Sequence, residues 1–236
     1  MKRLKFIGFI LMVVLLFKNC QKDYPIPTGD DGHAHTHVKI TSPGFPDIDI
    51  PADNPTTQEG IDLGRMLFYD SLLSADYTMS CGSCHNQAFG FSDNGNQFST
   101  GVDGIAGDIN ASAIINPGWL PSAFWDGRAS SLEEQALGPV PNEIEMHLEW
   151  DDAVARLTAH SSYPGLFENV FGNTPITKEL VVKAIAQFER TFVSDNSKYD
   201  RFLKGQTTLT VEEDRGYNLF FSEAGECFHC HGTILF

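Results

Sequence analysis

Apolar residues beyond about residue 56 return at the spacing of helices and not of strands. After Thr177 they recur every three or four positions, as on one face of a helix. Shorter helices are predicted over residues 151–159 and 163–171, the latter ended by Gly172. No run alternates as a strand would, so the pattern predicts an all-α fold. The predicted apolar face of the Thr177 helix comprises Leu180, Val181, Ala184, Ile185, Phe188 and Phe192.

Two stretches share one order of features and form an internal repeat. The first repeat begins at Thr56, with Glu59 three residues on, and the second begins at Thr210, with Glu213 three residues on. Both pairs match the capping box that starts a helix. Each is followed by Gly-x-x-Leu-Phe and an aromatic residue, a short loop and a cysteine motif, which suggests two copies of one small domain.

The N-terminal segment has the pattern of an export signal. Basic residues precede an apolar run over 6–17 that is short for a membrane span. Cys20 follows directly, and we expect it to be lipidated; cleavage nearby and an uncleaved anchor are the alternatives. Residues 1–20 are therefore assigned to the signal, and the protein to the periplasm or cell envelope.

Residues 21–55 are crowded with Pro, Gly and Asp and are predicted to be a tether that becomes ordered only near its end. His33, His35 and His37 lie in it. Alternating histidines can bind a transition metal, but solvated side chains are the favoured interpretation for an acidic tether. The N-terminal domain is placed at 56–205 and the start of a C-terminal domain at 206–236.

The chain is strongly acidic. Its formal net charge is −15, and because four of the 16 basic and none of the 31 acidic residues precede residue 21, the charge beyond that point is −19. Nucleic acid is therefore excluded as an expected partner. The acidic surface either steers a basic electron donor or only keeps the protein soluble.

Both cysteine motifs read Cys-x-x-Cys-His, the attachment signature of a c-type haem: Cys81, Cys84 and His85, then Cys227, Cys230 and His231. Two thiols on one turn can form thioethers with haem, and the next imidazole then becomes an axial ligand. Zinc, a thiol redox pair and a disulfide are the alternatives. With 8 histidines in 236 residues, a histidine after both pairs arises by chance about once in a thousand sequences. Two haem c groups are therefore predicted, with His229 as a spacer.

The order of the surrounding motifs resembles the bacterial di-haem cytochrome c peroxidase family from about residue 51 to the end. The resemblance rests on LGRMLFYD at 63–70, LS at 73–74, the first haem motif, FWDGRA at 124–129, SLE at 131–133, QA at 135–136 and EM at 145–146. It implies two cytochrome-c-like haem domains, the second incomplete in this chain. It also implies reduction of hydrogen peroxide with electrons from a small cytochrome c or another redox protein.

The resemblance assigns roles to three residues. It places Trp125 between the haems, where it assists electron passage, and makes Glu145 the active-site acid and Gln135 its polar companion over the first haem. A carboxyl group in a mostly apolar pocket can take a proton from peroxide and return it to the departing oxygen. Taken alone, Trp125 would be a core aromatic and Glu145 a solvated helix end.

The sequence departs from the family pattern after the first motif. Family members place a removable histidine ligand there, but no histidine lies between His85 and His147, and Gly101 falls near the expected position. The first haem is therefore expected to be five-coordinate at rest and open to peroxide, with His147 as the available substitute ligand.

Two further expectations concern the end of the chain. Only five residues follow the second motif, so we expect a truncated second domain whose distal haem ligand lies elsewhere. The resemblance also implies a homodimer of the full-length protein and an inter-domain calcium ion with Asn110 as a side-chain ligand, although a turn-forming asparagine is equally compatible. A related di-haem oxidase that matures a tryptophan-derived quinone, and a non-catalytic di-haem electron carrier, are the alternative functions.

Overall fold

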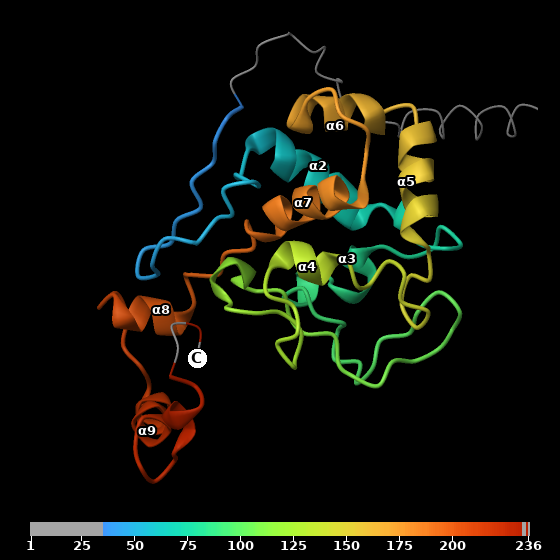
Figure 1. Ribbon diagram of the computed structural model, residues 1–236. Helices are drawn as coiled ribbons and strands as arrows, with labels where there is room; N and C mark the ends of the chain where they lie inside the picture. The colour runs from blue at the N-terminus through green and yellow to red at the C-terminus, as the bar shows by residue number, and fades with distance from the viewer. Residues whose placement is uncertain (1–34, 233–234, 236) are drawn as a thin grey trace, which may run out of the picture. The chain divides into compact units, whose positions relative to one another are not determined.

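The computed structural model describes residues 35–232 and 235, and its described part is helical. No β-strand forms there; the only pairing of extended segments consists of four isolated bridges. None of the described helices is long and apolar enough to span a bilayer. The helices, shown in Figure 1, are α2 (Gln58–Tyr69), α3 (Cys81–Cys84), α4 (Leu132–Ala136), α5 (Trp150–Ala159), α6 (Tyr163–Phe171), α7 (Lys178–Glu189), α8 (Lys198–Leu203) and α9 (Val211–Phe220). Short 3-10 turns are η2 (Ser71–Leu73), η3 (Gln87–Phe89), η4 (Pro117–Trp119) and η5 (Cys227–His229).

The core forms where α2 and α7 lie side by side, with α5 and α6 beside them (Figure 1). Gly64 makes the close crossing possible, because a Cβ there would lie 1.9 Å from the Ala184 carbonyl oxygen. The face predicted for α7 is buried except at Leu180, which is partly exposed. The expected all-α class is thus confirmed, and the apolar stripe of α7 is what closes the core over α2.

The start of α2 corrects the sequence prediction by one residue. Thr57, and not Thr56, is the N-cap: its hydroxyl accepts from the Gly60 N–H at 3.0 Å. The Gln187 carboxamide oxygen accepts from the Thr57 N–H at 2.9 Å and fixes this position. Thr177 and Thr210 cap α7 and α9 as predicted, and α6 ends at Gly172 with φ 75°.

Residues 35–55, inside the predicted tether, make specific contacts with the helical body. The Val38 N–H donates to the Thr56 carbonyl at 2.9 Å, and the Ser42 hydroxyl donates to the Asp195 carboxylate at 3.0 Å. The Asn54 side chain is buried and accepts from the Gln187 amide at 2.9 Å. His35 and the rest of this segment therefore follow a defined path, while Cys20 and His33 lie outside the described residues.

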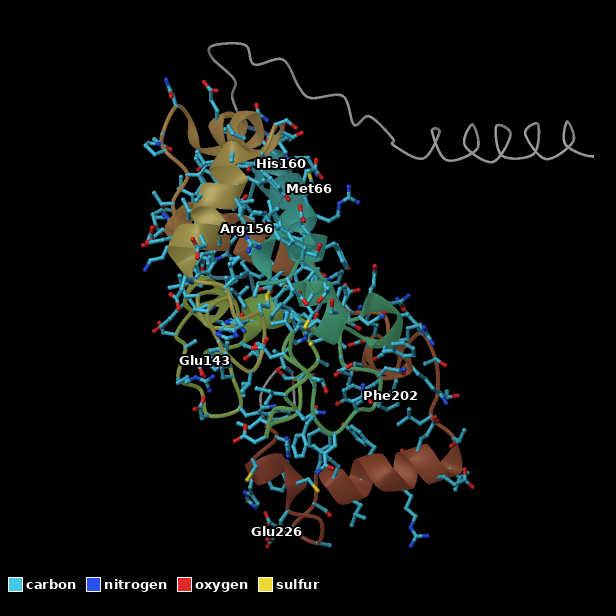
Figure 2. The ribbon with its side chains drawn as sticks, turned by 90° about the vertical axis from the view of Figure 1, so that its right-hand side faces the viewer. Met66, Glu143, Arg156, His160, Phe202 and Glu226 are labelled. Carbon is cyan, nitrogen blue, oxygen red and sulfur yellow. The ribbon has the colours of Figure 1, made fainter. Side chains whose placement is uncertain are left out.

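Helices α8 and α9 contact each other through aromatic side chains. Tyr217 of α9 packs edge-on against Phe202 of α8, with ring centroids 5.6 Å apart, and Phe202 is labelled in Figure 2. The capping box of Thr210 and Glu213 is complete, and Lys198 of α8 pairs with Glu213. A groove of about 400 Å³ opens between the two helices, and aromatic residues make up half of its lining: Tyr199, Tyr217, Phe220 and Phe221.

Candidate functional site

The first cysteine motif lies on the short helix α3, which follows the end of α2. The His85 N–H donates to the Cys81 carbonyl at 3.0 Å and brings the imidazole onto the same turn as both thiols. Gly82, between the cysteines, leaves space for the Tyr69 ring of α2, because a Cβ there would lie 2.5 Å from the Tyr69 Cδ1. Close packing of α3 on α2 therefore sets where this motif presents its sulfur and nitrogen atoms.

His85 is oriented by a backbone carbonyl. Its Nδ1 lies 3.0 Å from the Phe91 carbonyl oxygen, an acceptor only, so Nδ1 carries the proton and the lone pair is on Nε2. Burial also lowers the pKa of the imidazole, which favours its neutral form. This is the state and orientation that an axial ligand to iron requires.

The two thiols of the first motif are unpaired and held in their protonated form. Burial raises the pKa of Cys81 to about 12 and also raises that of Cys84. Reactive thiols and zinc thiolates occur where the pKa is lowered, and no cluster of three or more His, Cys, Asp or Glu side chains in the described part of the chain could hold a metal ion. The donor set fits covalent haem better than zinc or a redox dithiol.

An aromatic wall stands beside the first motif. Phe91, whose carbonyl orients His85, stacks on Phe192 with ring centroids 3.9 Å apart. Phe68 of α2 meets Phe192 edge-on at 5.6 Å and Phe188 at 5.5 Å. Such a wall is suited to a large apolar cofactor attached at Cys81 and Cys84.

Glu145 is partly buried and lies within electrostatic reach of both thiols, whose pKa values its charge raises. The Asn142 amide donates to the Glu145 carboxylate at 2.6 Å. Burial raises the pKa of Glu145, whereas the Asn142 hydrogen bond and the Arg128 charge lower it. The carboxyl group is thus fixed in position and easier to protonate than a solvated glutamate, as proton transfer requires.

Gln135 lies on α4 and is also partly buried. No hydrogen bond joins its side chain to Glu145 in the described part of the structure. The two residues predicted to act together are thus not joined by a hydrogen bond among the described residues.

The loop after the first motif is packed against the Glu145 segment. Gly101 lies so close to it that a Cβ would be 2.4 Å from the Ile144 carbonyl oxygen, and the Val102 N–H donates to the Glu145 carbonyl at 2.9 Å. His147, considered above as a substitute ligand, is exposed and bonds through Nδ1 to the Asp103 carboxylate at 2.5 Å. Position 101 thus has no room for a histidine in this arrangement, and the His147 Nδ1 is already engaged.

Trp125 and Asn110 are held together on the surface. Trp125 is 67% exposed, and its indole N–H donates to the Asn110 carbonyl at 2.8 Å. The Asn110 amide donates in turn to the Asn96 carbonyl at 2.8 Å. Trp125 is therefore no core aromatic. Asn110 brings no acidic cluster with it in the described chain, so calcium stays a prediction.

The second motif lies on η5 and is more open than the first. Cys227 is partly buried, whereas Cys230 and His231 are exposed. His229 faces the Glu223 carboxylate at 3.4 Å, in keeping with the predicted role of a spacer. The Phe220 ring centroid lies 6.2 Å from that of His231, so α9 stands beside this motif as α2 stands beside the first.

Sequence reasoning missed Glu189, a buried carboxyl group on α7. It is 4% exposed, and burial raises its pKa to about 8, with the Arg190 charge as the main opposing influence. Its charge also raises the pKa of the Cys81 thiol, so the two groups are near each other. The available signal was its position four residues after Ile185 on the apolar stripe. Asn142 was missed too, although it precedes Glu145 by three residues in a turn.

The chain is similar to known proteins over most of its length. Residues 58–208 match the family model for di-haem cytochrome c peroxidase. Cytochrome c551 peroxidase of Nitrosomonas europaea is 39% identical over 183 residues, 77% of this chain and 54% of that protein. Methylamine utilization protein MauG of Methylorubrum extorquens is 38% identical over 188 residues, 79% of this chain and 53% of that protein.

A solved structure, a MauG-like protein associated with microbial copper homeostasis, superposes with a TM-score of 0.75 at 38% identity, covering 80% of this chain and 56% of that one. The chain therefore spans about half the length of the curated relatives it matches. The family match covers more than half of the chain. This chain belongs to the di-haem cytochrome c peroxidase family.

Proposed function

We propose that the protein reduces hydrogen peroxide to water at a haem attached to Cys81 and Cys84 with His85 as axial ligand. The main support for this function is the partly buried Glu145, which Asn142 holds within electrostatic reach of the attachment thiols. The balanced reaction takes one peroxide, two electrons and two protons to two waters. Peroxidase relatives support the substrate class.

The attached haem supplies iron to bind peroxide and to pass electrons to it. The residues of the chain manage the protons: Glu145 removes one from the bound peroxide and returns it to the departing oxygen, so that water leaves. The raised pKa of Glu145 brings its two protonation states closer in free energy. Asn142 holds the carboxylate oxygen in place, and the aromatic wall keeps bulk water away.

Electrons are proposed to enter through a second haem, on Cys227, Cys230 and His231, and to pass near Trp125. The exposed indole of Trp125 supports this path, since a ring on the surface is available to a second domain. A small cytochrome c is the proposed donor, and the acidic charge of the chain suits a basic partner. We also propose a periplasmic or cell-envelope location with a lipid anchor at Cys20.

The test is steady-state oxidation of a reduced c-type cytochrome by the full-length, haem-loaded protein with and without hydrogen peroxide. The proposal expects peroxide-dependent oxidation with two cytochromes consumed per peroxide. Six-coordinate ferric haems that do not respond to peroxide, and no turnover, would support the non-catalytic electron carrier instead.

A second candidate function is the oxidase reaction that matures a tryptophan-derived quinone on another protein. It is favoured by the 38% identity with a methylamine utilization protein. The distal ligand of the second haem distinguishes the two functions. A tyrosine ligand favours the oxidase, and its ferric haem lacks the charge-transfer absorption band that a methionine sulfur gives. A methionine, with that band present, favours the peroxidase.

A further inference from the structure

Asp103 and His147 are joined by a short side-chain hydrogen bond beside the segment that carries Glu145. Asp103 lies in the loop after the first motif, and His147 follows Glu145 by two residues. The Asp103 Oδ2 and His147 Nδ1 are 2.5 Å apart, and both side chains are about half exposed. The pair therefore joins two segments that are 44 residues apart in sequence, directly beside the proposed acid–base residue.

The backbone around this pair is held at several further points. The Val102 N–H donates to the Glu145 carbonyl at 2.9 Å, and the Ala75 N–H donates to the Met146 carbonyl at 2.8 Å. Gly101 permits the close approach of the loop to Ile144. His147 itself has φ 49°, a left-handed conformation that costs free energy in most residues. A contact that holds His147 in this conformation also fixes the direction of the Glu145 segment.

We propose that Asp103 and His147 are positioning residues: their hydrogen bond clamps the loop 101–106 onto the Glu145 segment and so holds the Glu145 carboxyl group in the geometry that proton transfer needs. The inference rests on the proposed function for its catalytic part. Displacements on the order of 1 Å are enough to reduce rates strongly at such sites. Neither residue touches peroxide in this account; both act through the backbone of residues 144–147.

The experiment compares His147→Asn and Asp103→Asn in the full-length, haem-loaded protein. Asparagine tolerates the left-handed conformation, so His147→Asn removes the imidazole with little backbone strain. Asp47→Asn, which breaks the exposed Lys39–Asp47 pair at 3.1 Å, is the matched control. Amide hydrogen exchange at Val102 and the pH dependence of kcat are measured for each variant.

Both variants should speed exchange at Val102 by roughly three- to ten-fold and lower kcat by a similar factor, with KM for peroxide unchanged. They should also shift the acid limb of the kcat profile, which a purely structural role would leave in place. The swapped pair, Asp103→His with His147→Asp, should recover part of the loss, and the control should do neither.

Unchanged exchange at Val102 in both variants would overturn the proposal. Faster exchange with kcat and its pH profile unchanged would overturn the positioning role. A wild-type protein without peroxidase turnover would contradict the proposed function and with it the catalytic part of the inference. Exchange at Val102 would still decide whether the pair clamps the loop.

Discussion

The two repeats share their order of features and differ in what covers them. In the first, Gly64 of α2 lies against the Ala184 backbone, and Leu67, three residues on, is 0% exposed. In the second, Gly216 of α9 has no neighbour within 4 Å of an added Cβ, and Leu219 is 52% exposed. Within the described residues, similar sequence thus gives a buried helix in one place and an open one in the other.

This difference shows which features form from the local sequence alone and which require packing against other segments. Cap, helix and cysteine turn form in both repeats. A wall of side chains and a desolvated carboxyl group beside the thiols are described only for the first, because α7 and the 101–147 segments surround it. The proposed chemistry therefore belongs to the first repeat, and the following changes should affect the two repeats unequally.

The largest effect is expected from Glu145→Gln. The amide cannot carry the proton, so peroxide turnover should fall about 10²- to 10⁴-fold, the usual contribution of general acid–base catalysis. Glu226→Gln, beside the second motif, is the matched control and should leave turnover within about two-fold. Steady-state kinetics with a reduced cytochrome measures both, and equal losses would remove the asymmetry between the repeats.

Alanine at the paired glycines should destabilise only the first repeat. Gly64→Ala drives a methyl group into the Ala184 carbonyl and should cost roughly 2–3 kcal/mol of unfolding free energy. Gly216→Ala should be neutral or stabilise α9 by up to about 1 kcal/mol through helix propensity. Denaturant titration of the haem-loaded 236-residue chain checks this, and a loss at Gly216 comparable to that at Gly64 would contradict the description of α9 as open within this chain.

Glu189 should give the first repeat a characteristic pH dependence. Because its folded-state pKa is raised from 4.5 to about 8, the folded protein keeps a proton that the unfolded chain releases, and stability is lost as pH rises through this range. Glu189→Gln should flatten that decline and stabilise the protein at pH 8 by roughly 1–3 kcal/mol.

Glu213 of the second repeat should behave in the opposite way. The Lys198 hydrogen bond lowers its pKa, so its contribution to stability is present above the unfolded-state pKa and is lost as pH falls. Unfolding curves between pH 4 and 9 for Glu189→Gln and Glu213→Gln test both signs. Parallel curves for the two variants would show that Glu189 is not desolvated.

The smallest effect is expected from Asn142→Leu. Its amide hydrogen bond lowers the pKa of Glu145, so its loss should raise that pKa further and move the acid limb of the kcat profile to higher pH, with a several-fold loss of turnover near neutrality. Asn218→Leu on α9, whose amide bonds only within its own helix, is the control. An acid limb that stays in place would show that Asn142 does not bond to Glu145 in the active protein.

The sequence predicted features that depend on nearby residues. The caps at Thr177 and Thr210, the end of α6 at Gly172 and the turn that joins Cys81 to His85 each depend on a few adjacent positions. The error at Thr56 has a tertiary cause: Thr56 has Glu59 three residues on, as the capping box requires, but a distant contact from Gln187 fixes Thr57 as the N-cap.

Longer-range features could not be predicted from the sequence. The Asp103–His147 pair joins segments 44 residues apart, and no local period encodes it. The helical period places Glu189 beside the apolar stripe of α7, but its raised pKa depends on segments that are distant in sequence. The difference in burial between α2 and α9 is not written in the Gly-x-x-Leu-Phe pattern that they share; it follows from which segments of the described chain pack on each helix. The roles of Gln135, Trp125 and Asn110 still rest on the family resemblance.

The most direct test of the central claim, that the first repeat carries the peroxide chemistry, is single-turnover kinetics on a full-length variant with Cys227→Ala and Cys230→Ala. This protein should hold only the haem on His85, and the structure places Glu145 and the aromatic wall beside the motif to which that haem would be attached. Rapid mixing with hydrogen peroxide should change its absorption at a rate within a few-fold of the two-haem protein. The account would be contradicted if the haem on His85 did not respond to peroxide while the haem on His231, in the Cys81→Ala and Cys84→Ala variant, did respond.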